Sequence, residues 1–148
     1  GRPPEIDLHL EKQVHSFLRN IIKKRIINSA HDLGNGGLAV ALAECSISSG
    51  LGANITLPPS QSRLDRILFA EGGARVLVSC SDDQVIELKK YYKNLSLQEN
   101  NFFSISHLGT VNDQKKLSVF QSNNLIIDLN ILNLKDRYKN SIYQKVSN

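Results

Sequence analysis

The sequence predicts an α+β fold: a layered α/β sandwich in which helices cover a mixed or antiparallel sheet, followed by a C-terminal β-meander and a last helix. Two observations predict it. Helix-like and strand-like spacings of apolar residues alternate over the first two thirds of the 148 residues, and apolar and polar residues alternate over the last third. Because a chain of this length suits one domain, we expect a single domain over 1–148, with 1–6 as a linker.

The first helix is predicted to follow the Pro3-Pro4 pair and to end near Arg25. Asp7 is well placed to cap its N-terminus. The apolar residues of this stretch recur at helical spacing and predict a single buried face. They are Leu10, Val14, Phe17, Leu18 and Ile21.

A strand is predicted over 26–33, then a glycine turn, then a helix over 37–48 that is apolar nearly all round. Such a helix should be covered on both sides. A short strand over 53–57 should stop at the two prolines that follow it. One or two helical turns are expected over 64–70, because apolar residues cluster there between polar connections.

The stretch 75–80 is rich in Val and Leu and predicts a buried strand. Ser81 and Gln84 have the spacing of a capping box, which predicts a helix from there to about Asn94.

The last third predicts strands over 102–111, 117–120 and 125–131, joined by polar turns. Asn133 is then expected to cap a final helix.

Composition excludes several classes of partner. The net charge of +4, from 18 basic and 14 acidic residues, is too small and too scattered to predict nucleic-acid binding. Cys45 and Cys80 lie far apart without a CxxC pair, so we expect reduced core thiols of a cytosolic protein. No apolar run approaches the roughly 18 residues that a membrane span needs. Methionine is absent, which favours a piece cut from a longer protein.

The most informative stretch is the turn that contains Gly34, Gly36 and Gly37. Glycines adopt positive φ and allow close approach to main-chain N–H groups, and the following helix adds its positive end. Such a turn suits a phosphate or a carboxylate. Gly34-x-Gly36-x-x-Ala39 also resembles a dinucleotide fingerprint, but the acid expected about 20 residues later is missing, which disfavours that interpretation.

Two further groups of polar residues flank this turn or could reach it. His31 and Asp32 could contact a phosphate, shuttle a proton or help to hold a metal, or they could be structural residues of a strand end. Glu71 and Arg75 could bind a polar ligand, or they could form an ion pair across a tight turn. The residues alone leave both pairs of alternatives open. They predict neither a metal site nor a nucleophile–base pair.

Residues 31–44 (HDLGNGGLAVALAE) resemble the HD-x-SDGGLAVALAE signature of phosphoribosylformylglycinamidine synthases, which belong to the aminoimidazole ribonucleotide synthetase-like superfamily. Three more stretches match in the same order: 1–8 (GRPPEIDL), 68–79 (LFAEGGARVLVS) and 105–111 (ISHLGTV). The resemblance covers about residues 1–131, which is most of the chain.

The resemblance implies that the chain is the C-terminal domain of a longer synthetase subunit. The family converts formylglycinamide ribonucleotide to its amidine, in de novo purine biosynthesis, with ATP, Mg²⁺ and ammonia from glutamine. The smaller bacterial form works with a separate glutaminase subunit and a small accessory subunit. We therefore expect a cytoplasmic protein that contacts the upstream domains of its own subunit. The full subunit would bind ATP and Mg²⁺, and the 148 residues alone would be inactive.

Candidate residues for nucleotide or phosphate contacts are His31, Asp32, Gly34, Asn35, Gly36, Gly37, Glu71 and Arg75. The family usually has Ser-Asp where this chain has Gly34-Asn35, and an amide lacks the negative charge that Mg²⁺ prefers. The resemblance implies a catalytic subunit built from two copies of a two-domain unit, with this chain as the C-terminal domain of the second copy. In the first copy a Glu-Ser-x-Glu-Arg loop contacts the substrate, and here only Glu71 and Arg75 match it. These departures predict that this copy of the unit has the more structural role and supports an auxiliary nucleotide. The alternatives are a scaffold without ligand contacts and a free-standing nucleotide-binding module.

Overall fold

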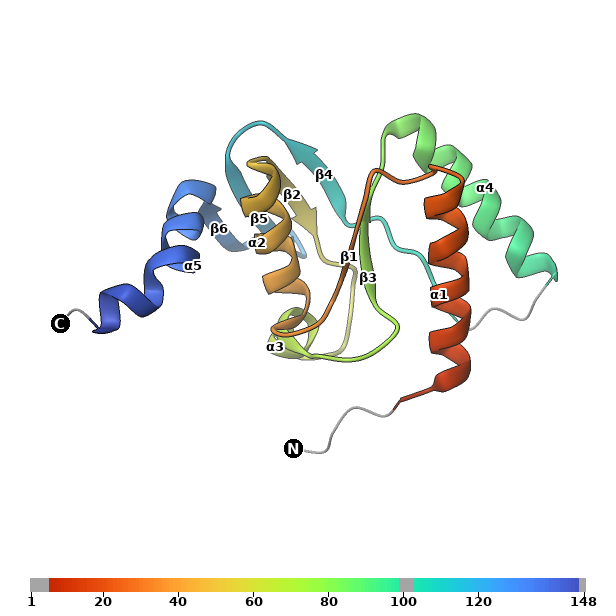
Figure 1. Ribbon diagram of the computed structural model, residues 1–148, viewed down its shortest axis with the longest axis horizontal. Helices are drawn as coiled ribbons and strands as arrows, with labels where there is room; N and C mark the ends of the chain where they lie inside the picture. The colour runs from red at the N-terminus through yellow and green to blue at the C-terminus, as the bar shows by residue number, and fades with distance from the viewer. Residues whose placement is uncertain (1–5, 99–102, 147–148) are drawn as a thin grey trace. The chain divides into compact units, whose positions relative to one another are not determined.

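The computed structural model describes residues 6–98 and 103–146 (Figure 1). Their contacts divide the chain into two compact units, residues 1–41 with 68–105 and residues 42–67 with 106–148. Helices and mixed or antiparallel strands occur in both, so the predicted α+β class is confirmed. That residues 1–148 form a single domain, with 1–6 as a linker, stays a prediction.

The first unit contains two long helices and a two-stranded antiparallel sheet. Its elements are α1 (Leu8–Lys23), β1 (Ser29–Asp32), the start of α2 (Gly37–Ser49), the end of α3 (Leu64–Phe69), β3 (Val76–Ser79) and α4 (Asp82–Gln98). β1 pairs with β3 so that His31 lies opposite Leu77. Both strands are shorter than predicted. Strand β3 is half-buried rather than buried, because a sheet of only two strands covers little of either face.

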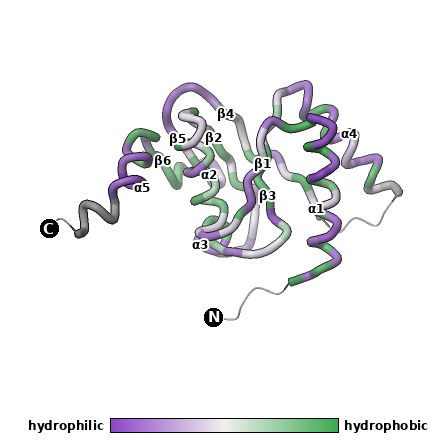
Figure 2. The backbone as a smooth tube through the Cα atoms, in the orientation of Figure 1, coloured by the Kyte–Doolittle hydropathy of each residue, from purple (hydrophilic) through white to green (hydrophobic). Residues whose placement is uncertain are grey.

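Helix α1 begins as the sequence predicts. The Asp7 carboxylate accepts hydrogen bonds from the N–H groups of His9, at 2.9 Å, and Leu10, at 3.1 Å. Figure 2 shows hydrophobic and hydrophilic residues alternating along α1. The buried apolar face holds Val14, Phe17 and Ile21.

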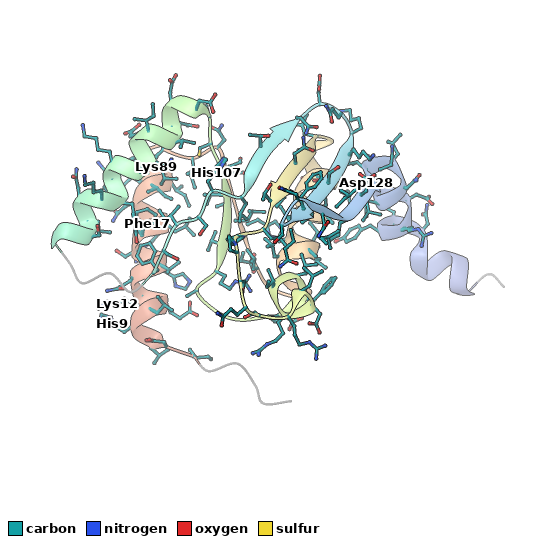
Figure 3. The ribbon with its side chains drawn as sticks, turned by 180° about the vertical axis from the view of Figure 1, so that it is seen from behind. His9, Lys12, Phe17, Lys89, His107 and Asp128 are labelled. Atoms are coloured by element: carbon teal, nitrogen blue, oxygen red, sulfur yellow. The ribbon has the colours of Figure 1, made fainter. Side chains whose placement is uncertain are left out.

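An aromatic cluster joins α1 to α4. The ring of Phe17, labelled in Figure 3, lies 5.7 Å from that of Tyr91 and 5.2 Å from that of Phe103 between ring centres. The Tyr92 hydroxyl donates to the Phe103 carbonyl at 2.6 Å, which satisfies a half-buried polar group. The buried centre of this core consists of Phe17, Ile21, Ile26 and Leu88.

The capping box of α4 is confirmed. The Ser81 N–H donates to Gln84 Oε1 at 2.8 Å, and the Gln84 N–H points back at Ser81 Oγ at 3.4 Å. Gln84 Nε2 also donates to the Arg25 carbonyl at 3.0 Å, which ties the start of α4 to the end of α1. The helix runs to Gln98, one turn beyond the predicted end near Asn94.

The second unit is built on a four-stranded sheet in the order β4-β2-β5-β6. Its elements are the rest of α2, β2 (Gly52–Thr56), most of α3, β4 (Gly109–Asn112), β5 (Lys116–Gln121), β6 (Asn124–Asn130) and α5 (Ile131–Val146). β2 is antiparallel to β4 and parallel to β5, and β5 and β6 form an antiparallel hairpin with a bulge at Val119/Phe120.

The predicted meander differs in one respect, because β2 is inserted between β4 and β5. Strand β2 places Ala53 and Ile55 in the core beside Leu117 and Val119, and a central position buries that face fully. The strand predicted over 102–111 is also shorter. Only Gly109–Asn112 is strand, residues 103–108 have no regular structure, and residue 102 lies outside the described residues.

The predicted cap of the last helix is wrong. Asn130 rather than Asn133 caps α5, because Asn130 Oδ1 accepts from the N–H groups of Leu132 at 2.8 Å and Asn133 at 3.4 Å. Helix α5 starts directly at Ile131, which is buried and so fixes the boundary between strand and helix.

Both cysteines are free and half-buried. Burial raises the pKa of both thiols, and the Glu44 carboxylate raises that of Cys45 further. Within the described residues, none of the helices is both long and apolar enough to cross a membrane.

Candidate functional site

The site lies in the first unit, where the turn between β1 and α2 meets the segment 68–75. Antiparallel pairing places Asp32, at the end of β1, opposite Val76, at the start of β3. Just beyond the ladder, the Leu33 N–H donates to the Arg75 carbonyl at 3.1 Å. Two groups of candidate residues that are more than 30 positions apart in the sequence are therefore brought together.

The turn depends on two glycines in the left-handed region. Gly36 has φ +79° and Gly37 has φ +64°. A Cβ atom on Gly37 would lie 2.8 Å from the carbonyl oxygen of Ala70 and 2.9 Å from that of Leu68. Only glycine therefore allows the start of α2 to sit against the segment 68–71.

Two N–H groups of the turn are already paired. The Gly37 N–H donates to the Gly34 carbonyl at 3.1 Å, which closes the turn. The Gly36 N–H donates to Glu71 Oε1 at 2.9 Å. The anion that this turn holds in the structure is thus a carboxylate of the same chain, close to the positive end of α2.

Glu71 and Arg75 take different partners. The carboxylate of Glu71 faces Gly36, whereas Arg75 Nη1 donates to the Ala70 carbonyl at 3.1 Å. The ion pair between Glu71 and Arg75, one of the two alternatives that the sequence left open, is not among the ion pairs of the described residues. Arg75 instead braces the backbone of the segment that carries Glu71.

His31 is held by its own strand end. Its Nδ1 lies 2.6 Å from the Asp32 carbonyl oxygen. A carbonyl only accepts, so Nδ1 carries the proton in this contact and the neutral ring is the Nδ1–H tautomer. The side chains of Asp32 and Asn35 are exposed beside the turn. None of these contacts tests a ligand role for the three residues, which stays a prediction.

The residues of the site do not fit a resident magnesium ion. Mg²⁺ favours negatively charged oxygen ligands, and Asn35 offers only a neutral amide oxygen. Within the described parts of the chain, no group of three His, Cys, Asp or Glu side chains could hold a metal ion.

A second polar cluster, which the sequence analysis missed, lies on the sheet of the second unit. Lys116 Nζ is 2.7 Å from Asp128 Oδ2, and Ser118 Oγ is 3.0 Å from Asp128 Oδ1. The hydrogen bond from Lys116, together with that from Ser118, lowers the pKa of the Asp128 carboxyl. Figure 3 labels Asp128 on this sheet. Alternation along β5 places Lys116 and Ser118 on the same face of the sheet. The register of β5 with β6 then brings Asp128 beside them, which the sequence does not show.

The fold and the site define an α+β protein in which the carboxylate of Glu71 contacts a glycine turn at the start of a helix. A family model described as AIR synthase related protein, C-terminal domain, matches residues 1–122. The chain belongs to this family.

Curated relatives sharpen this assignment. The chain is 77% identical over 147 residues to phosphoribosylformylglycinamidine synthase subunit PurL of Prochlorococcus marinus strain NATL1A, covering 99% of this chain and 18% of the relative. The protein of the same name from strain NATL2A is 75% identical over the same shares. The predicted resemblance is confirmed. The chain spans less than a fifth of the length of these relatives.

Solved structures share the fold. Phosphoribosylformylglycinamidine synthase II of Thermotoga maritima matches with a TM-score of 0.75 at 19% identity, covering 89% of this chain and 22% of that chain. T. maritima PurL complexed with FGAR matches with a TM-score of 0.71, and the same protein complexed with ATP with 0.70. A structure of PurLQS from T. maritima matches with 0.71. In these last three, 84% of this chain and 21% of that chain are covered, at 19% identity.

Proposed function

We propose that the chain is the C-terminal domain of a synthetase subunit that forms formylglycinamidine ribonucleotide from formylglycinamide ribonucleotide, with ATP and ammonia, in the cytoplasm. The observation that carries the proposal is the 77% identity over 147 residues to a PurL subunit. The glycine turn of the family signature supports it, because it adopts a closed geometry against the segment 68–75. The reaction belongs to the ATP-dependent ligases that make carbon–nitrogen bonds.

In this proposal the chain contributes one wall of a nucleotide site, and the rest of the subunit supplies the remainder. His31, Asp32, Asn35 and Arg75 are the side chains of this wall, and Gly34, Gly36, Gly37 and Glu71 shape it. Mg²⁺ and the phosphates that it accompanies are assigned to the rest of the subunit, because Asn35 lacks the negative charge that Mg²⁺ prefers and the described residues hold no cluster of three His, Cys, Asp or Glu for a metal. ATP supplies the activating phosphoryl group when it is bound there.

The partners follow from the same proposal. We assign to the complete protein a glutaminase subunit, which releases ammonia, and a small accessory subunit. The structure of PurLQS from T. maritima supports an assembly of this kind in a protein of the same fold.

Reconstitution tests the proposal directly. A subunit of the length of the curated relatives, ending in this chain, is expected to form the amidine when supplied with ATP, Mg²⁺, formylglycinamide ribonucleotide and ammonium. The 148-residue chain alone is expected to show no turnover. Turnover by the isolated chain, or inactivity of the full-length subunit with its partners present, would contradict the proposal.

One observation favours a second candidate, a scaffold domain without ligand contacts. Glu71 already fills the hydrogen-bonding position at Gly36 that a phosphate would use. Substituting Asn35, which is exposed on the turn, separates the two candidates. Asn35→Ala in the full-length subunit lowers nucleotide affinity or turnover if the wall contacts nucleotide, and leaves both unchanged if the domain is a scaffold.

A further inference from the structure

Four contacts hold the turn 33–37 and the segment 68–75 in place within the first unit: three join the two stretches, and one, from Arg75 to Ala70, lies within the segment 68–75. Two are hydrogen bonds that end on backbone carbonyls: Leu33 N–H to Arg75 at 3.1 Å and Arg75 Nη1 to Ala70 at 3.1 Å. The third is the close approach of Gly37 to the carbonyls of Leu68 and Ala70. The fourth is the hydrogen bond from Gly36 N–H to the Glu71 carboxylate at 2.9 Å.

The fourth contact differs from the others because an acidic side chain makes it. The Glu71 carboxylate accepts from the Gly36 N–H and so orients a peptide group inside the turn. Gly36 has φ +79° and no side chain, so its peptide plane can rotate more freely than that of any other residue type. A carboxylate that accepts from this N–H removes that freedom. The bond is charge-assisted, and the positive end of α2, a helix of 13 residues, strengthens it further.

Glu71 is exposed, so it adds little to the hydrophobic core of its unit. Its effect should therefore be local, on the turn, rather than on the stability of the whole chain. This separates it from Gly37, whose replacement would push against main-chain atoms.

We propose that Glu71 is a positioning residue for the glycine turn: its carboxylate fixes the Gly36 peptide and, through it, the orientation of Asn35 and the first turn of α2. The effect on catalysis rests on the proposed function, because it needs the turn to serve a nucleotide site. The contact between Glu71 and Gly36 does not depend on that function.

The first experiment measures amide hydrogen exchange at Gly36 by NMR in the 148-residue chain. Glu71→Ala is expected to speed exchange at Gly36 about tenfold to hundredfold, the factor that corresponds to losing a charge-assisted hydrogen bond. Glu71→Gln should restore most of the protection, because its amide oxygen can still accept. Glu87→Ala, which removes an exposed acid from α4 in the same unit, should leave Gly36 unchanged. Equal exchange in wild type and Glu71→Ala overturns the proposal.

The second experiment uses the full-length synthetase subunit and measures kcat and KM for the nucleotide substrates. Glu71→Ala is expected to lower kcat/KM about tenfold, with an unchanged melting temperature and with rescue by Glu71→Gln. Glu87→Ala should match wild type. Faster exchange at Gly36 with unaltered kinetics supports the contact but overturns a role for it in the reaction. An inactive wild-type subunit contradicts the proposed function alone, because the exchange result stands independently.

Discussion

The two units of the chain hold their strands in different ways. In the first unit β1 and β3 form a sheet of only two strands, and an isolated pair of strands has marginal stability. Its order depends on side chains, above all on the aromatic cluster of α1 and α4, while the contact of Glu71 orders the glycine turn locally. In the second unit four strands share hydrogen-bonded ladders and a buried apolar face. The glycine turn thus lies in the unit where single side chains matter most.

The largest expected effect is on the aromatic cluster. Phe17→Ala should lower the free energy of unfolding by about 3–5 kcal/mol, because Phe17 is buried and contacts three other rings. Urea unfolding measures this. Ile86→Ala on α4, where the residue is 69% exposed, is the control and should change stability by less than about 0.5 kcal/mol. If Phe17→Ala lowered the free energy of unfolding as little as Ile86→Ala does, the first unit would not depend on its aromatic cluster.

The next effect concerns the turn itself. Gly37→Ala should cost about 2–3 kcal/mol, because it combines a positive φ with carbonyl oxygens less than 3 Å from the new Cβ atom. Gly72→Ala is the matched control, since a Cβ atom there meets nothing within 4 Å. Chemical unfolding of both variants checks the prediction. Equal stabilities would mean that the segment 68–71 moves away from the turn at little cost.

A smaller effect tests the start of α5 in the second unit. Asn130→Ala should cost about 1 kcal/mol, because it removes the acceptor for two N–H groups of the first turn. Asn133→Ala should be nearly neutral, as Asn133 lies inside the helix. Thermal melts of the two variants compare them. The opposite ranking would restore Asn133 as the cap.

The smallest effect concerns the polar cluster on the same sheet. Lys116, and after it Ser118, lowers the pKa of Asp128, so the folded pKa lies below the unfolded one. The stabilisation is therefore present above the unfolded pKa of about 3.9 and is lost as the pH falls through the folded value. Stability measured between about pH 6 and pH 2 should fall less steeply in Asp128→Asn than in wild type. Asp113→Asn, on the exposed turn between β4 and β5, serves as the control. Identical pH profiles of stability for wild type and Asp128→Asn would show that the polar cluster does not stabilise the second unit.

Features that the sequence predicts correctly are local. Asp7 and the pair Ser81 and Gln84 cap their helices within three residues along the chain, so spacing alone identifies them. The glycine turn is found for the same reason, because its residue types demand an unusual backbone.

Features that the sequence analysis misses depend on long-range partners. The insertion of β2 between β4 and β5 joins strands about 60 residues apart. Glu71 was identified as a candidate, but its partner Gly36 is 35 residues away, and the alternatives considered for it were only Arg75 and a polar ligand. The cap of α5 was misplaced because the helix starts directly after β6, at the buried Ile131, three residues before the start that the sequence favoured.

The two adjacent glycines of the turn differ in what evolution can do with them. At Gly36, where the φ of +79° already strains any other residue, the side chain in the way of a Cβ atom is that of Val40, and a smaller residue at position 40 would make room. At Gly37 the obstacles are main-chain atoms, which every amino acid carries. No compensating substitution can remove them, so Gly37 cannot be replaced for as long as the backbone of the segment 68–71 stays in place.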